Sequence, residues 1–197
     1  MYKLGLTGGI ATGKSTVSHY LHQQNIPVID ADAVAHDVLN TDNRVLTDLR
    51  ATFGDSIFIE GQLSRPRLGK IVFGDIDALD KLNKITHQRI FERISNIAEE
   101  LALAGNTFIV YDIPLLLESP SPVAFDAIMV VTTTAEQQLQ RLMVRNNLSQ
   151  EDAQKRIDSQ MPIAEKVKQA DFVINNNGSI MDTYKQVQQV LEQIQHA

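Results

Sequence analysis

The stretch that most constrains the fold of this chain is a glycine-rich loop near the N-terminus. Gly8, Gly13, Lys14 and Ser15 match the pattern G-x-x-x-x-G-K-[ST]. An apolar segment over residues 2–6 precedes the loop, and a helical pattern follows it. Glycines allow the backbone angles and the close approach that an anion-binding loop requires. The spacing therefore predicts a strand, a phosphate-binding loop and a helix, in that order.

This loop indicates a site for a nucleoside triphosphate. Its backbone N–H groups and the N-terminus of the next helix are expected to point at phosphate oxygens. Lys14 is expected to reach the β- and γ-phosphates, and Ser15 to ligate Mg²⁺ as the cofactor. The alternative is a glycine-rich turn without a ligand. The ATP-binding residues predicted in the loop are Gly8, Gly9, Ala11, Thr12, Gly13, Lys14, Ser15 and Thr16.

Composition narrows the classes of protein that this chain can represent. Its 197 residues are 43% hydrophobic, which suits one domain with a real core. The absence of cysteine excludes disulfides and a thiolate zinc site. Apolar runs too short for a bilayer and the lack of a signal-peptide pattern predict a cytoplasmic protein without membrane association. A net charge of −6 disfavours nucleic acid as a partner. Nothing in the sequence indicates an obligate protein partner.

Short apolar runs alternate with helical patterns along the chain. Continuous apolar runs are typical of parallel strands that are covered on both faces. Their alternation with helices predicts an α/β fold, a parallel sheet flanked by helices. Strands are expected at residues 2–6, 27–29, 107–113, 127–132 and 171–174. Helices are expected at residues 14–23, 33–39, 85–103, 135–146, 149–160 and 181–195.

The segment between the second and third predicted strands is too long for a single crossover. We therefore expect an inserted, mainly helical lobe over residues 40–105, with turns at residues 53–55 and 60–61. The lobe is expected to belong to one folding unit of residues 1–197. The core of that unit is predicted to comprise residues 1–39, 106–134 and 170–197.

This sequence lacks the signature motifs of several classes of phosphate-loop protein. A signalling GTPase would carry N-K-x-D, whereas the Asn-Lys pair of this chain reads "NKIT" at residues 83–86. An ATPase motor usually ends its second motif in Asp-Glu, but Asp112 is followed by Ile113. A small-molecule kinase needs neither motif, only an acid near the acceptor hydroxyl and cations on a mobile lid.

Acidic residues follow two of the predicted strands. Ligands of doubly wound folds bind beyond the carboxyl ends of the strands, where Asp30 and Asp32 are expected. Asp32 is our candidate for accepting the proton of an attacking hydroxyl, with Asp30 in support. The alternative role for Asp32 is the N-cap of the next helix. Asp112 is predicted to order magnesium-bound water or the acceptor, or else to stabilise a turn.

Residues 141–168 resemble a closing lid of two short helices. Arg141 and Arg145 lie one helical turn apart, and Arg156 comes from the next helix, which opens with a capping box at Ser149. Such arginines would bind ATP phosphates and stabilise the transition state. Alternatively, they are solvated surface charges that contribute little.

Motifs spread over nearly the whole chain resemble one family, the dephospho-CoA kinases of coenzyme A biosynthesis. In order, they are "LTGGIATGKSTV", "VIDADAVAH", "LSRPRLGKIVF", "LNKITHQRI", "YDIPLLLE", "RLMVRNNLSQEDAQKRIDSQ" and "ADFVINNNG". The resemblance implies a P-loop nucleotide-kinase-like fold with a substrate lobe and a lid. It also implies transfer of the ATP γ-phosphate to the ribose 3′-hydroxyl of dephospho-CoA, giving CoA and ADP.

The resemblance also assigns roles to single residues. It makes Asp32 the acid–base, with Lys14 and Arg141 completing the catalytic set. It places Arg141 and Arg145 against ATP, and residues 175–178, beginning with Asn175, at its adenine. The inserted lobe, including Arg65, Leu68, Phe73, His87 and Arg89, would bind the CoA moiety, although Leu68 and Phe73 read more readily as core than as ligand contacts. The substrate-binding set is then Thr7, Asp32, His87, Arg89, Asp112 and Leu115.

Two other hypotheses for the function stay open at this point. One is a nucleoside monophosphate or shikimate-type kinase. The other is a non-catalytic module in which ATP binding drives association with a partner.

Overall fold

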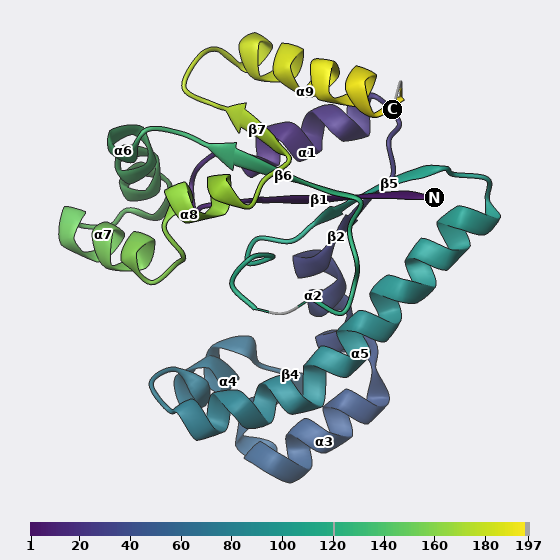
Figure 1. The fold of residues 1–197 in the computed structure, drawn as a ribbon. Coiled ribbons are helices and arrows are strands. Elements are labelled where there is room, and N and C mark those ends of the chain that lie inside the picture. Colours follow the sequence, from purple (N-terminus) through teal and green to yellow (C-terminus); the bar gives the residue numbers. More distant parts are fainter. Residues whose placement is uncertain (120, 196–197) are drawn as a thin grey trace. The chain divides into compact units, whose positions relative to one another are not determined.

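A five-stranded sheet forms the centre of the fold. The computed structural model describes residues 1–119 and 121–195 (Figure 1). The strand order is β2-β5-β1-β6-β7, and β1 pairs in parallel with both β5 and β6. Strand β7 extends the sheet in parallel beyond β6. The strands are β1 (Tyr2–Gly8), β2 (Val28–Asp30), β5 (Phe108–Asp112), β6 (Ala127–Thr132) and β7 (Phe172–Asn175).

This sheet confirms the predicted parallel α/β architecture, and β6 has the predicted bounds. The central strand β1 is buried from Leu4 to Gly8. Because successive side chains point to opposite faces of a strand, such a run must be covered on both sides. The continuous apolar reading of β1 is therefore explained by its central place in a sheet that is covered on both faces.

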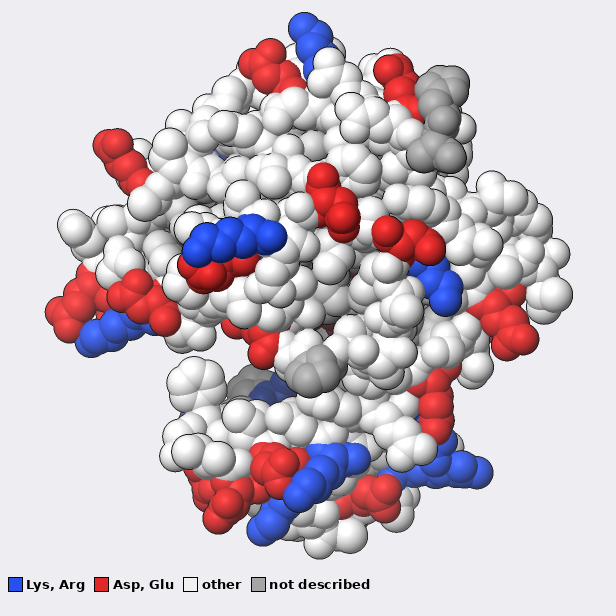
Figure 2. Space-filling model, viewed as in Figure 1, with Lys and Arg blue, Asp and Glu red and all other residues white. Residues whose placement is uncertain are grey.

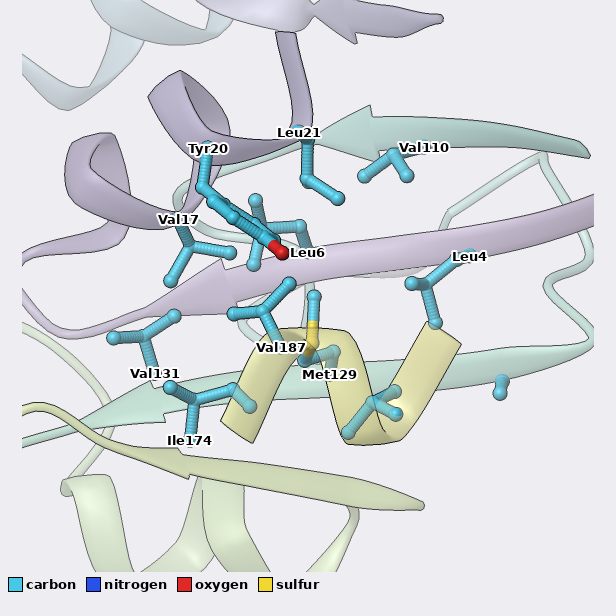
Figure 3. Packing of buried hydrophobic residues seen from close by; sticks show 12 residues of the cluster. Leu4, Leu6, Val17, Tyr20, Leu21, Val110, Met129, Val131, Ile174 and Val187 are labelled. Atoms are coloured by element: carbon cyan, nitrogen blue, oxygen red, sulfur yellow. The ribbon is translucent and has the colours of Figure 1, made fainter. Parts of the chain in front are cut away.

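One face of the sheet packs against helices α1 (Lys14–Gln23) and α9 (Ile180–Gln195), which also contact each other (Figure 1). Figure 3 shows Leu4 and Leu6 of β1 pointing into this layer, where they meet Val17, Leu21 and Val187. Tyr20 of α1 also contacts Tyr184 of α9, with ring centroids 4.5 Å apart. This core fixes the axis of α1 against the sheet and with it the loop before the helix.

The opposite face is covered by the segment that follows β5 and by α8 (Ile163–Lys168), which packs on β6. Gly5 of β1 points to this side. A Cβ built on Gly5 would lie 2.6 Å from the Leu116 side chain and 3.4 Å from Phe125. Tyr111 meets Phe125 edge-on, with the ring centroids 5.4 Å apart. The glycine therefore makes room for an aromatic and aliphatic cover on this face.

Two further helices lie between β6 and β7 in the chain. They are α6 (Ala135–Asn146) and α7 (Gln150–Asp158), and α6 has the bounds that the sequence predicts. Ser149 is the N-cap of α7: its hydroxyl accepts from the Asp152 N–H at 3.1 Å and donates to the Asp152 carboxylate at 2.8 Å. The N-cap half of the predicted capping box is confirmed, and the return contact runs from the Ser149 hydroxyl to Asp152.

The chain divides into two compact units. The first, which we call the sheet unit, comprises Met1–Ile29 and Ala104–Ala197, and the second, the lobe, comprises Asp30–Leu103. The elements of the lobe are α2 (Ala31–Thr41), α3 (Asn43–Phe53), a 3-10 turn (Asp55–Ile57), β3 (Phe58–Ile59), β4 (Gln62–Leu63), α4 (Arg65–Val72) and α5 (Ile76–Leu103). Helices α2, α3 and α4 all pack on α5, which makes it the central element of the lobe.

Turns and caps set the boundaries inside the lobe. Gly54 ends α3 with a positive φ of 80°, and the hairpin between β3 and β4 turns at Glu60 and Gly61, where both φ angles are positive. Positive φ at both central residues is typical of a tight hairpin turn. Both predicted turns are confirmed. The hairpin itself and the early start of α5, at Ile76 rather than residue 85, were not predicted.

Acidic and basic side chains are interspersed on the face of the molecule that Figure 2 shows. Some charged side chains of the protein pair along single helices, for example Lys155 with Glu151 and Lys168 with Glu165. Within the described residues, we find no helix of the length and apolar character that a bilayer crossing requires.

Candidate active site

The glycine-rich loop runs from the end of β1 to the start of α1. Gly8 is the last residue of the strand, and Gly13 caps the helix with a left-handed φ of 96°. Within α1, the first turn carries no acidic residue and no side chain caps it. By helix geometry the N–H groups at Lys14 and Ser15 have no acceptor within the helix. They are placed to receive an anion, which the helix dipole attracts.

Side chains from the C-terminal half of the sheet unit hold the carbonyl groups of this loop. Gln138 of α6 donates its amide to the Ile10 carbonyl at 2.8 Å. The Thr12 carbonyl accepts from the Asn176 amide at 2.8 Å and from Arg141 at 3.5 Å. In a trans peptide the C=O and the following N–H point in opposite directions. The N–H groups that follow these two carbonyls are therefore directed away from the side chains that hold them.

Asn176 lies in the range predicted to border adenine, but its contact with the phosphate loop was not predicted. It lies directly after β7 and is buried, and its side-chain oxygen accepts from the Thr183 hydroxyl at 2.7 Å. Its backbone carbonyl also accepts from Arg141 at 3.0 Å. The predicted Asn175 is exposed, and its side chain accepts from the Asn177 N–H at 3.0 Å. Side chains alternate between the two faces of a strand, so a residue two positions after the buried Ile174 is expected on the buried side. This alternation is the signal that distinguishes Asn176 from Asn175.

Lys14 and Asp112 form an ion pair at the end of the sheet. Asp112 ends β5 and is only 4% exposed, and Leu6 of the neighbouring strand β1 is its partner in register. Its second carboxylate oxygen accepts from the Ser18 hydroxyl, one turn along α1 from Lys14. A buried carboxylate is costly unless it is paired and hydrogen-bonded, as it is here. The pair holds the lysine ammonium close to the start of α1.

The three arginines proposed for the lid differ in their surroundings. Arg141 is half-buried and donates to the Asn176 carbonyl after β7 and to the Thr12 carbonyl of the loop. Arg145 is exposed and donates to the side chain of Asn146 at 2.9 Å. Arg156 is exposed on α7. The structure thus brings Arg141 to the loop, while Arg145 points to a neighbour on its own helix.

The two acids that follow β2 have different local roles in the lobe. Asp30, not Asp32, is the N-cap of α2, because its carboxylate accepts from the Ala33 N–H at 3.0 Å. Asp32 lies in the first helical turn and is exposed. The idea that Asp32 caps this helix is therefore wrong. The helix begins two residues earlier than predicted.

The remaining predicted substrate residues are spread over both units. In the sheet unit, Thr7 is fully buried and donates its hydroxyl to the Pro114 carbonyl at 2.9 Å, while Leu115 is 47% exposed. In the lobe, His87 is exposed on α5 with its ring near Phe91, and Arg89 donates to Glu92 at 2.7 Å.

For Leu68 and Phe73, the sequence allows either a place in the core or a contact with the CoA moiety. Leu68 of α4 is 4% exposed and belongs to the core of the lobe. Phe73, which follows α4, is 92% exposed. The core reading is confirmed for Leu68 and wrong for Phe73.

Comparison with known proteins identifies the family. The family model for dephospho-CoA kinase matches residues 2–182. The chain belongs to the dephospho-CoA kinase family. Curated members of this family include proteins from Listeria monocytogenes serovar 1/2a and Latilactobacillus sakei, each 48% identical to this chain. The first alignment covers 96% of this chain and 95% of the relative, and the second covers 99% and 96%.

Solved structures agree with this family membership. A dephospho-CoA kinase from Campylobacter jejuni is 33% identical, with a TM-score of 0.74, and the match covers 98% of this chain and 96% of that one. A crystal structure from Thermus thermophilus is 31% identical with a TM-score of 0.82, over 98% and 97% of the two chains. A shikimate kinase from Acinetobacter baumannii is 15% identical with a TM-score of 0.52, which shows a shared fold alone.

Replacing Gly13 by alanine tests whether the loop geometry matters to the kinase. A Cβ at this position would lie 1.8 Å from the Asn176 amide nitrogen, and φ is 96°. Backbone strain alone costs about 1–3 kcal/mol, and the overlap displaces the side chain that holds the Thr12 carbonyl. We expect a lower free energy of unfolding in urea and weaker ATP binding in a titration.

Gly69→Ala is the matched control for Gly13→Ala. Gly69 lies inside α4, has no positive φ, and has no other atom within 4 Å of a built Cβ. There alanine is expected to raise the free energy of unfolding by about 0.4–1 kcal/mol. A Gly13→Ala protein as stable as the parent, with unchanged ATP affinity, would contradict the role of this glycine.

Proposed function

We propose that this chain transfers the γ-phosphoryl group of ATP to the ribose 3′-hydroxyl of dephospho-CoA, giving CoA and ADP. This reaction is the last step of coenzyme A biosynthesis, and membership of the family supports it. The observation that carries the proposal is the geometry of the loop between β1 and α1. Gln138 and Asn176 donate to two carbonyls of the loop. The N–H groups at the start of α1, which have no acceptor within the helix, lie next to Lys14 and its partner Asp112.

On the phosphate side, each proposed role follows from charge and position. The loop amides would bind the β-phosphate, and Lys14 would exchange part of its contact with Asp112 for phosphate oxygens. Arg141 stands against the loop and would stabilise charge on the transferring group. Arg145 has an exposed guanidinium that would have to leave Asn146 to reach the nucleotide. Asn175, with Asn176 behind it, would border the adenine.

The loop residues also suit Mg²⁺ held mainly by the substrate. Mg²⁺ usually keeps several waters and takes one or two protein oxygens together with phosphate oxygens. The described residues contain no group of three His, Asp or Glu that would make a separate metal cage. We assign the exposed Ser15 hydroxyl as a ligand and Asp112 as a partner of metal-bound water. The ion would neutralise charge that develops on the β- and γ-phosphate oxygens.

On the acceptor side, Asp32 is the proposed base. An exposed carboxylate can accept a hydroxyl proton as that oxygen attacks phosphorus. Its position in the first turn of α2, directly after a sheet strand, supports the assignment. His87 and Arg89 of α5 and Leu115 after β5 are proposed to contact dephospho-CoA, with the buried Thr7 supporting the Leu115 segment through Pro114.

A panel of acceptors tests the substrate assignment directly. ADP release is measured with Mg-ATP and dephospho-CoA, AMP, CMP, shikimate or no acceptor. We expect release with dephospho-CoA that exceeds every other condition. Turnover with CMP, AMP or shikimate instead would favour a different small-molecule kinase, and ATP binding without release under any condition would favour a non-catalytic module.

A further inference from the structure

Lys166 is a fully buried lysine that neither the loop motif nor the lid arginines account for. It lies in α8, and its side chain has no solvent exposure. The ammonium donates to Glu118 at 2.6 Å. It also donates to the Gly8 carbonyl at 3.3 Å and lies 3.5 Å from the Pro114 carbonyl. All these partners belong to the sheet unit.

These contacts join the ends of two neighbouring strands. Gly8 is the last residue of β1 and the first glycine of the loop. Pro114 and Glu118 belong to the segment that follows β5, two residues or more beyond the Asp112 carboxylate that binds Lys14. The Thr7 hydroxyl donates to the same Pro114 carbonyl at 2.9 Å. One ammonium therefore fixes the start of the phosphate loop and the segment that carries Leu115.

The Gly8 contact completes a pattern in the loop. Gln138 holds the Ile10 carbonyl and Asn176 holds the Thr12 carbonyl, so the carbonyls of Gly8, Ile10 and Thr12 all accept from side chains outside the loop, whereas the Gly9 carbonyl accepts from the Thr12 hydroxyl within it. Because C=O and the next N–H point in opposite directions, the three donors set the directions of three alternate N–H groups. Lys166 sets the first of them, at Gly9.

Stability alone is a weak reason for a buried ion pair at this place. Removing two charges from water costs about as much as their attraction returns, and apolar residues of the same volume often serve equally well. A buried pair that also binds two backbone carbonyls restricts their geometry, which apolar side chains cannot do. The arrangement suits a part of the chain whose position has to be exact.

We propose that Lys166 is a positioning residue for phosphoryl transfer, which acts by fixing the Gly8 carbonyl and the Pro114–Glu118 segment. The inference rests on the proposed kinase function. Lys166 does not touch the reacting groups. It sets the direction of the first loop amide and the place of the acceptor-side segment, and small errors in such positions slow a reaction strongly.

The test compares Lys166→Met, Glu118→Gln and the double variant. Methionine keeps most of the aliphatic volume and removes the ammonium. We expect Lys166→Met to lower kcat by roughly tenfold to a hundredfold, with the KM for ATP changed by less than about threefold. It should also lower the urea midpoint, because Glu118 is left as a partly buried charge without its partner.

The double variant separates positioning from stability. Removing both charges should return the urea midpoint toward that of the parent, because no unpaired charge remains. If Lys166 positions the loop, kcat stays low in this stable protein. If its role is only structural, kcat recovers with the midpoint and the proposal is overturned. Lys168→Met, on the same helix but exposed and paired with Glu165, is the control and should behave as the parent.

The panel of acceptors shows whether a failure concerns the substrate assignment or the role of Lys166. If the parent protein fails with dephospho-CoA, the substrate assignment is wrong, and the same variants are compared with the acceptor that does release ADP. A kcat that is low in both Lys166 variants supports positioning with either acceptor. A parental kcat in Lys166→Met contradicts it with either acceptor.

Discussion

Lys14→Ala is expected to reduce turnover by roughly a thousandfold and to weaken ATP binding in the same protein. The lysine places a positive charge beside the N–H groups at the start of α1, and alanine removes that charge from the phosphate site. Loss of one fixed donor to a developing negative charge typically costs about 10²- to 10³-fold in rate. Steady-state ADP release and titration with a fluorescent ATP analogue measure the two effects.

The same substitution also removes the partner of a buried acid, so stability has to be measured alongside. Asp112 is 4% exposed and would keep only the Ser18 hydroxyl. Breaking such a pair costs about 3–5 kcal/mol, whereas Lys14→Ala/Asp112→Asn leaves no unpaired charge. The double variant should regain stability and remain inactive. Lys185→Ala on α9 removes an exposed lysine and should retain the parental rate. A Lys14→Ala protein with near-parental turnover would remove the lysine from the mechanism.

The elements that the sequence predicts well are those whose signal is local. Helices α1 and α6 and strand β6 have the predicted bounds, because periodicity and flanking loop residues mark their ends within a few positions. Helix α5 starts nine residues before its prediction. Asp75 accepts from the Ala78 N–H at 3.0 Å, so a cap was present in the sequence, but the polar first turns of this helix hid the periodicity.

The candidate site was predictable where it lies on one continuous motif and not where distant segments meet. The loop residues follow from spacing. The contact of Asn176 with Thr12 joins residues 164 positions apart, and that of Lys166 with Gly8 joins residues 158 positions apart. Both depend on the strand order β1-β6-β7, which periodicity does not reveal. Ser18 was similarly hidden, because its role appears only when β5 places Asp112 next to α1.

Asp32→Asn is expected to lower kcat by roughly two to four powers of ten while ATP affinity stays close to the parental value. The substitution keeps the size and hydrogen-bonding capacity of the side chain but removes the basic oxygen that would accept the acceptor proton. General-base catalysis typically contributes a factor of about 10²–10⁴. Single-turnover phosphoryl transfer from Mg-ATP to dephospho-CoA, with ATP binding measured separately, gives both quantities.

The structure makes this substitution a clean test, because Asp30 and not Asp32 caps α2. Asparagine at position 32 removes the attraction between this carboxylate and the helix N-terminus, which is worth about 0.3–1 kcal/mol. Asp37→Asn makes the same chemical change on the same helix, at an exposed residue 3.9 Å from Arg93, and should leave kcat unchanged. If Asp32→Asn and Asp37→Asn slow the reaction equally little, the attacking hydroxyl must lose its proton to another group, and the assigned base is wrong.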